Sequence, residues 1–79
     1  MTDHLLKALI SVIAMLDDAL KSGMDSHAAV NALEGVAFEL DQMDDSERLE
    51  FKEAINRVAD AADPAQREWI RNLPRNLGI

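Results

Sequence analysis

Cysteine is absent from this chain of 79 residues, and several other residue types are scarce. Without thiols, the chain can form neither a disulfide framework nor a thiolate metal site. Tyrosine is absent as well, and aromatic residues make up only 4% of the sequence. Three glycines and two prolines leave few points at which the backbone can turn sharply. The composition therefore excludes a disulfide-stabilised scaffold and favours long, uninterrupted elements of secondary structure.

Positive charge is also in short supply, because eight Lys and Arg residues stand against fifteen Asp and Glu residues, for a net charge of −7. This balance argues against a nucleic-acid partner, since phosphate contacts need clustered cations. The charge is unevenly distributed: residues 1–63 hold fourteen acids and five bases, or −9, whereas residues 64–79 hold one acid and three bases, or +2. The sequence thus predicts an acidic body with a basic C-terminal end.

Long hydrophobic runs are missing too. The most apolar stretch, Ala8 to Leu16, has nine residues, whereas a membrane span needs about twenty. The N-terminus lacks the basic start of a signal peptide, and no small-residue cleavage pattern follows the apolar stretch. With 48% hydrophobic and 29% charged residues, the chain has a globular balance. We expect one soluble domain over residues 1–79, in the cytoplasm and without a membrane partner.

Hydrophobic periodicity predicts four helices, at about residues 3–21, 25–42, 46–62 and 64–73. The first has the widest apolar face, which covers more than half of its circumference and is typical of a helix that is central in a bundle or buried in a dimer. The apolar stripes expected to face the core are, in chain order, Leu5, Leu9, Val12, Ile13, Leu16 and Leu20, widened by Leu6, Ile10 and Met15; Ala29, Val30, Leu33, Val36, Ala37, Leu40 and Met43; Phe51, Ala54, Ile55, Val58 and Ala62; and Trp69, Ile70 and Leu73.

The boundaries of these helices carry recognisable signals. Gly23 can take the left-handed conformation that often ends a helix. Asp44 with Glu47 three residues later has capping-box spacing, and Asp63-Pro64 places a proline at a first helical position. Pro74 predicts the end of the fourth helix. The fold class expected is all-α: a compact four-helix bundle or orthogonal helical array with a short fourth helix and an irregular C-terminal tail.

The motif Gly23-Met24-Asp25-Ser26 stands where the second helix begins. Asp25-Ser26 resembles the Asp-Ser-Leu motif of acyl and peptidyl carrier proteins, which are acidic four-helix domains, and the resemblance covers about twelve residues. It implies that Ser26 would carry phosphopantetheine. His27 stands where that family has leucine, and the loop before the serine is much shorter than in the family. A glycine ending one helix and Asp25 or Ser26 capping the next explains the motif without modification, so we favour a helix boundary.

Other chemistry finds no support in the residue pattern. The acids between Asp41 and Glu50 lack the spacing of a calcium loop, since its third and sixth positions would be Met43 and Ser46. The two histidines lack the i,i+4 spacing of a helical zinc pair. No glycine-rich loop or nucleophile–base arrangement is visible. We therefore expect no metal, no cofactor and no catalytic activity.

The remaining signals concern protein binding. Phe38 lies about 150° from the centre of the apolar stripe of its helix, where a polar residue is expected, and acids surround it. Phe38 either packs against the first or fourth helix or anchors an interface. In the second case, the predicted partner-binding residues are Glu34, Phe38, Asp41, Asp44 and Asp45. The hypothesis is a small acidic, non-catalytic inhibitor resembling immunity proteins or antitoxins that covers a basic partner surface. A homodimeric structural or regulatory subunit, associating through the first helix, is the alternative, and a carrier protein modified at Ser26 a further one.

Overall fold

The computed structural model describes residues 3–23 and 26–79, and all regular structure in these ranges is helical. The helices, in chain order, are α1 (Asp3–Lys21), α2 (Ser26–Asp41), α3 (Asp45–Ala61), α4 (Pro64–Arg71) and α5 (Leu73–Asn76). The all-α prediction is confirmed. The first three helices agree with their expected ranges to within a residue at either end.

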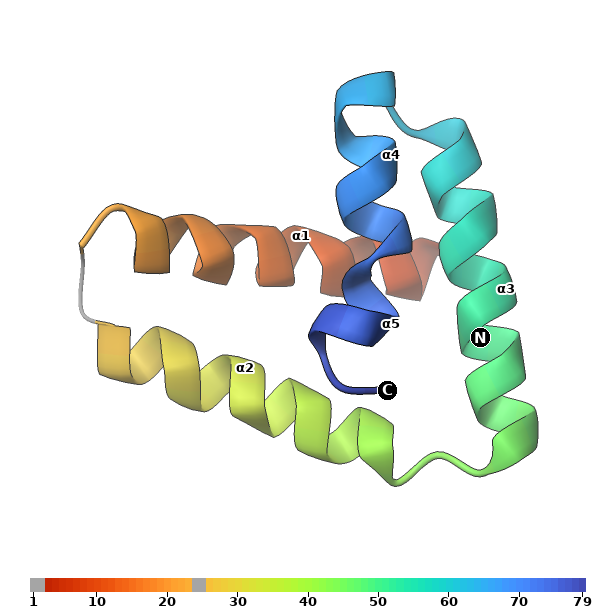
Figure 1. Ribbon diagram of the computed structural model, residues 1–79, viewed down its shortest axis with the longest axis horizontal. Coiled ribbons are helices and arrows are strands. Elements are labelled where there is room, and N and C mark those ends of the chain that lie inside the picture. The colour runs from red at the N-terminus through yellow and green to blue at the C-terminus, as the bar shows by residue number, and fades with distance from the viewer. Residues whose placement is uncertain (1–2, 24–25) are drawn as a thin grey trace.

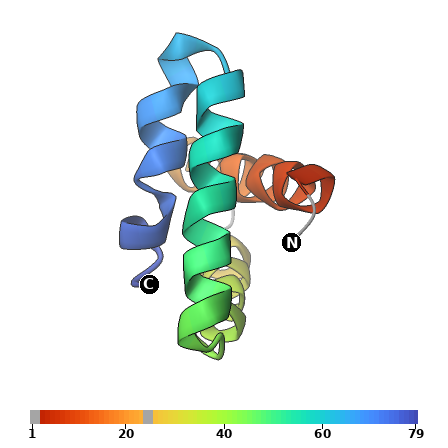
Figure 2. The same cartoon turned by 90° about the vertical axis from the view of Figure 1, so that its right-hand side faces the viewer.

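The helices form two pairs that cross at a steep angle. α1 and α2 run antiparallel as a hairpin, and α3 with α4 stands across one end of it (Figure 1). α1 packs against both α2 and α3, whereas α4 packs against α3. Figure 2 shows α4 and α5 on one side of α3 and α1 projecting on the other. The molecule measures 35 × 30 × 19 Å, and since a helix with its side chains is about 10 Å across, it is about two helices thick.

The helix boundaries follow the local signals in the sequence. Gly23 has a φ of 75°, the left-handed conformation expected of a residue that follows a helix. The capping box at α3 is complete: the Glu47 backbone N–H donates to Asp44 Oδ1 over 2.8 Å, and the Asp44 N–H donates to Glu47 Oε1 over 3.2 Å. Pro64 opens α4, although the preceding Asp63 makes no side-chain capping bond. Local chemistry therefore sets where α3 and α4 begin.

The C-terminal segment differs from the expectation. The fourth helix ends at Arg71 and not at Leu73, and a further turn, α5, replaces the irregular tail that we predicted. Proline is tolerated in the first turn of a helix, where its missing N–H would have no partner, so Pro74 fits into the first turn of α5, which begins at Leu73. The Leu77 N–H donates to the Leu73 carbonyl over 2.9 Å, and the Ile79 N–H donates to the Pro74 carbonyl over 2.8 Å. The end of the chain is thus wound against itself.

The core is centred on α3. Phe51, Ala54, Ile55 and Val58 are buried as the periodicity predicts, and Ala59 joins them. Burying a side chain such as Phe or Ile contributes about 1.5–3 kcal/mol, so α3 supplies much of the stabilisation. The other buried apolar residues are Leu6, Ile10 and Ile13 of α1, Ala29 of α2, Ile70 of α4 and Leu73 of α5. Trp69, expected to face inward, is only partly buried against this core.

The buried face of α1 is rotated relative to the predicted stripe. Leu6, Ile10 and Ile13 are buried, whereas Leu5 and Val12, both placed in the stripe, are exposed. Both series are apolar with helical spacing, so periodicity alone cannot distinguish them. The difference arises because α2, α3 and α4 all lie on the Leu6–Ile10 side of α1. This rotation leaves an apolar strip of α1 facing outward. Val30 of α2, also predicted to be buried, is exposed as well.

Candidate functional site

Phe38 lies on the outer face of α2. Nine residues at 100° each place it about 180° around the helix from the buried Ala29, and 65% of its surface is exposed. The interpretation that it packs against the first or fourth helix is therefore wrong. Glu34 and Asp41, one turn to either side, are exposed on the same face. The structure thus places an aromatic ring between two carboxylates on one surface, which we call the Phe38 surface.

The acids predicted to join this surface have different roles. Asp41 is held by Arg48, whose Nη2 lies 3.1 Å from Asp41 Oδ1 and 2.7 Å from the Asp41 carbonyl oxygen. Asp44 is engaged in the capping box of α3. Asp45 and Glu34 are exposed and make no hydrogen bond or ion pair with the described part of the chain. Among these acids, the charges available to a partner are therefore chiefly those of Glu34 and Asp45, with Asp41 partly compensated by Arg48.

Arg48 was missed by the sequence analysis. Its Nε donates to the Met43 carbonyl over 3.1 Å while its Nη2 binds Asp41. It thereby satisfies carbonyl groups at the C-terminal end of α2, which a helix leaves without intrahelical partners. No spacing rule in the sequence predicts this contact, because it depends on the angle at which α3 leaves α2.

The Ser26 hypothesis can be placed only in part. α2 begins at Ser26, in agreement with a helix boundary, and His27 is exposed in the first turn. Met24 and Asp25 lie outside the described residues. Gly23 has the left-handed backbone expected of a helix end. That Ser26 marks a helix boundary and is not modified stays a prediction, which intact mass after incubation with a phosphopantetheinyl transferase tests directly.

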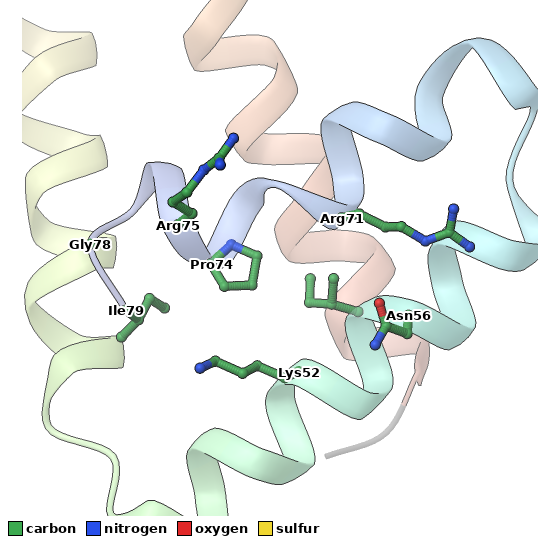
Figure 3. Close-up of a pocket in the computed structure, with 8 residues that line it drawn as sticks. Lys52, Asn56, Arg71, Pro74, Arg75, Gly78 and Ile79 are labelled. Atoms are coloured by element: carbon green, nitrogen blue, oxygen red, sulfur yellow. The ribbon is translucent and has the colours of Figure 1, made fainter.

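A basic cleft lies between α3 and the α4–α5 segment (Figure 3). It has a volume of about 490 Å³ and is lined by Lys52, Ile55, Asn56, Arg71, Pro74, Arg75, Gly78 and Ile79. Its cations do not converge: Arg71 pairs with Asp60 of α3, and Arg75 points away from Lys52. The cleft therefore lacks the preorganised donors of a small-anion site, and we assign it a structural role.

One ion pair has a clear electrostatic signature. Arg57 of α3 donates two hydrogen bonds to the Asp3 carboxylate, from Nη2 to Oδ1 over 2.9 Å and from Nε to Oδ2 over 3.3 Å. These hydrogen bonds lower the pKa of Asp3 below its usual value, and the same contact raises the pKa of Arg57. Since both side chains remain about half exposed, this pair links the start of α1 to α3 without forming a reactive site.

Metal binding and membrane insertion find no structural support in the described ranges, 3–23 and 26–79. These residues contain no group of three or more His, Asp or Glu side chains that could hold a metal ion. Nor does any helix within them combine the length and apolar character that a bilayer crossing demands. Comparison with known proteins finds no match: no family model, no curated protein and no solved structure is significantly similar to this chain.

Proposed function

We propose that this protein is a non-catalytic binding module that covers a basic surface of a protein partner, in the manner of an immunity protein or antitoxin. The observation that carries this proposal is Phe38, 65% exposed between Glu34 and Asp41. A large aromatic side chain on an otherwise polar helix face adds nothing to the core of its own chain. At protein interfaces, binding hot spots often consist of an aromatic side chain surrounded by polar groups.

The charge of the chain supports a basic partner. A net charge of −7 on 79 residues attracts cationic surfaces at separations up to about a Debye length, which raises the rate of encounter. Glu34, one turn from Phe38, and Asp45, in the first turn of α3, are both exposed with no ion-pair partner in the described residues, so they can meet Lys or Arg side chains without first breaking an internal ion pair. Inhibition by covering a surface requires no chemistry of the inhibitor, in keeping with the lack of catalytic motifs in the sequence.

Binding kinetics can separate the contribution of the Phe38 contact from that of the acidic charges. The measurement is surface-plasmon resonance at two salt concentrations against the protein that co-purifies with the chain or is encoded beside it. Phe38→Ala should speed dissociation and weaken binding by about 2 kcal/mol or more. Reversing Glu34 and Asp45 to Lys should mainly slow association, and raised salt should have the same effect.

Leu49 of α3 provides the control for Phe38 of α2, because it is also a large apolar side chain with most of its surface, 59%, exposed. Leu49→Ala should leave both rate constants unchanged. If Leu49→Ala and Phe38→Ala weaken binding equally, or if neither does, the Phe38 surface is not the binding site. If binding is insensitive to salt, the partner is not recognised through its basic charge.

A further inference from the structure

The outward side of α1 is an uncharged apolar strip. Leu5 is 68%, Val12 46% and Met15 63% exposed. At 100° per residue, these three side chains, Ala8, Leu16 and Ala19 fall within a sector of about 100° on α1, and of these six only Met15, at one edge of the sector, lines the cleft between α1 and α4. No charged residue lies in that sector, since all five charged residues of α1 project from the other sides: Asp3, Lys7, Asp17, Asp18 and Lys21. Three large exposed hydrophobic residues on one helix face are unusual in a monomer.

A shallow apolar groove runs beside this strip, between α1 and α2. It has a volume of about 430 Å³ and is lined by Leu9, Ala32, Gly35, Val36, Glu39 and Leu40. Ala32 and Gly35 are exposed and small, so the α2 side of the hairpin is low where the α1 side is raised by Leu5 and Val12. We call the α1 strip and this groove together the hairpin face. It consists of a ridge with a trough beside it.

Gly35 is unexplained by the packing of a single chain. It sits inside α2, where glycine costs about 1 kcal/mol relative to alanine. The backbone φ of Gly35 is not positive, and a Cβ built on Gly35 would meet no atom within 4 Å. Neither the backbone nor a neighbour in the described chain therefore requires glycine. A helix from outside that approaches the backbone closely would require it, because only glycine leaves that space free.

We propose that the hairpin face binds a second copy of this chain, as a two-fold symmetric dimer in which the α1 ridge of each copy lies in the trough of the other. A two-fold interface must be self-complementary, with each residue pair occurring twice. A ridge and a trough side by side on one face meet that requirement. This proposal goes beyond the proposed function and uses a different surface.

Charge favours a second copy over a basic partner at this face. Two chains of net charge −7 repel each other unless they meet where acids are absent. The hairpin face as defined carries a single charged residue, Glu39, which lines the groove. A cationic partner, by contrast, would find no counter-charges on the ridge. The face that two acidic copies can share is therefore the one that a basic protein has least reason to bind.

The hairpin face is of the order of size that a small dimer interface needs. Nineteen residues make α1 about 28 Å long at 1.5 Å per residue. With helix axes about 8–10 Å apart, the hairpin is about 20 Å wide. The projected face is thus roughly 560 Å², and its accessible area is larger because side chains corrugate it. A specific interface buries about 800 Å² on each partner, so nearly the whole face would be used.

The test is sedimentation equilibrium of the full chain over a wide dilution series, with circular dichroism to check folding. We expect a reversible species of twice the 8.7 kDa chain mass. Leu5→Lys and Val12→Lys should each weaken dimerisation at least about tenfold. Both changes lower the net negative charge of the chain, so a loss of dimer cannot come from greater overall repulsion and reports on the substituted position. Leu49→Lys is the matched control for Leu5→Lys, as both leucines are largely exposed, and it should leave the dimer intact.

Gly35→Met tests the trough separately. Met is a good helix former, and nothing within the described chain occupies the space that its Cβ would enter, so the variant should fold at least as well as the wild type. Its side chain would fill the trough and weaken the dimer at least about tenfold. A wild-type chain that stays monomeric throughout the series overturns the proposal. A dimer that survives Val12→Lys and Gly35→Met, or that Leu49→Lys disrupts equally, also overturns it.

Discussion

The α3–α4–α5 half and the α1–α2 hairpin use their large apolar residues in different ways. In α3, five apolar residues are buried and a single large one, Leu49, is exposed. In the hairpin, Leu5, Val12, Met15, Val30 and Phe38 are all exposed, and α2 buries only Ala29. The buried hydrophobic residues of the α3–α4–α5 half thus stabilise the chain itself. The hairpin contributes Leu6, Ile10 and Ile13 to the same core, but its five exposed large residues are placed where only another molecule can bury them.

This difference indicates that the core around α3 provides most of the stability, whereas the exposed residues of the hairpin are available for binding. A chain of this length buries only about 60% of its unfolded surface, so exposing large apolar side chains is a considerable loss to a small domain. The loss is confined to α1, α2 and Leu49, while the core around α3 stays intact. Substitutions in the two halves should therefore affect different measurements.

The two phenylalanines give the sharpest form of the comparison. Phe51 is 2% exposed, whereas Phe38 is 65% exposed. Phe51→Ala should cost about 3–5 kcal/mol of unfolding free energy, because it leaves a cavity in the core, and this is most of the stability of so small a domain. Phe38→Ala should change stability by no more than about 0.5 kcal/mol. Urea unfolding of both variants, followed by circular dichroism, measures this contrast. Equal losses of unfolding free energy in the two variants would contradict it.

Trp69 connects the two halves. It lines one cleft with Ala14 and Asp18 of α1 and another with Leu33 of α2. Trp69→Ala should therefore cost about 3 kcal/mol, at the lower end for a large aromatic residue, since the ring is only partly buried. Thermal unfolding gives the cost, and the native fluorescence of the only tryptophan gives its environment. A fully water-exposed emission spectrum would show that Trp69 does not join the halves.

Substitutions of Asp44 and Asp45 distinguish a capping hydrogen bond from a charge–dipole interaction at the start of α3. Asp44→Ala removes the side-chain acceptor of the capping box and should cost about 1 kcal/mol. Asp45→Ala removes a charge in the first turn of α3, which is worth about 0.3–1 kcal/mol to the helix dipole. Chemical denaturation of both single variants ranks them. If Asp45→Ala costs more than Asp44→Ala, the capping box is not what stabilises the start of α3.

The Asp3–Arg57 pair should have the smallest effect. Because the folded protein lowers the pKa of Asp3, the pair stabilises the fold at pH values above the unfolded pKa of about 3.9. This stabilisation is lost as the pH falls through the folded value. Asp3→Asn should lower the melting temperature slightly at neutral pH and leave it unchanged in strong acid. Raised salt should reduce the difference at neutral pH, since the pair is largely exposed. An effect that grows with acidity would contradict the sign of the pKa shift.

The sequence predicts α3 well and α1 only in part, for a physical reason. α3 has one apolar face and one charged face, so Phe51 and Ile55 can only point inward. The apolar face of α1 covers more than half of the helix, so the pattern allows either Leu5 or Leu6 to be buried. The choice depends on which side α3 and α4 occupy. The α5 turn was missed because Pro74 is compatible both with the end of one helix and with the first turn of the next.

The candidate site shows the same division. The exposure of Phe38 follows from its angle on a helix with a clear polar side, and the capping role of Asp44 follows from its spacing to Glu47. The contact of Asp41 with Arg48 could not be predicted, because it depends on the angle between α2 and α3. The trough at Gly35 could not be predicted either, because residues of both α1 and α2 form it.

The α2–α3 corner has a consequence for the order in which the chain folds. Arg48 reaches Met43 and Asp41 across five and seven residues, and the capping box spans three. Contacts this local close within about 10–100 ns in a flexible chain and lose little loop entropy. We therefore expect the corner to be structured in the folding transition state, with φ-values near one for Asp44 and Arg48. The contact between Asp3 and Arg57, 54 residues apart, should form only after that barrier.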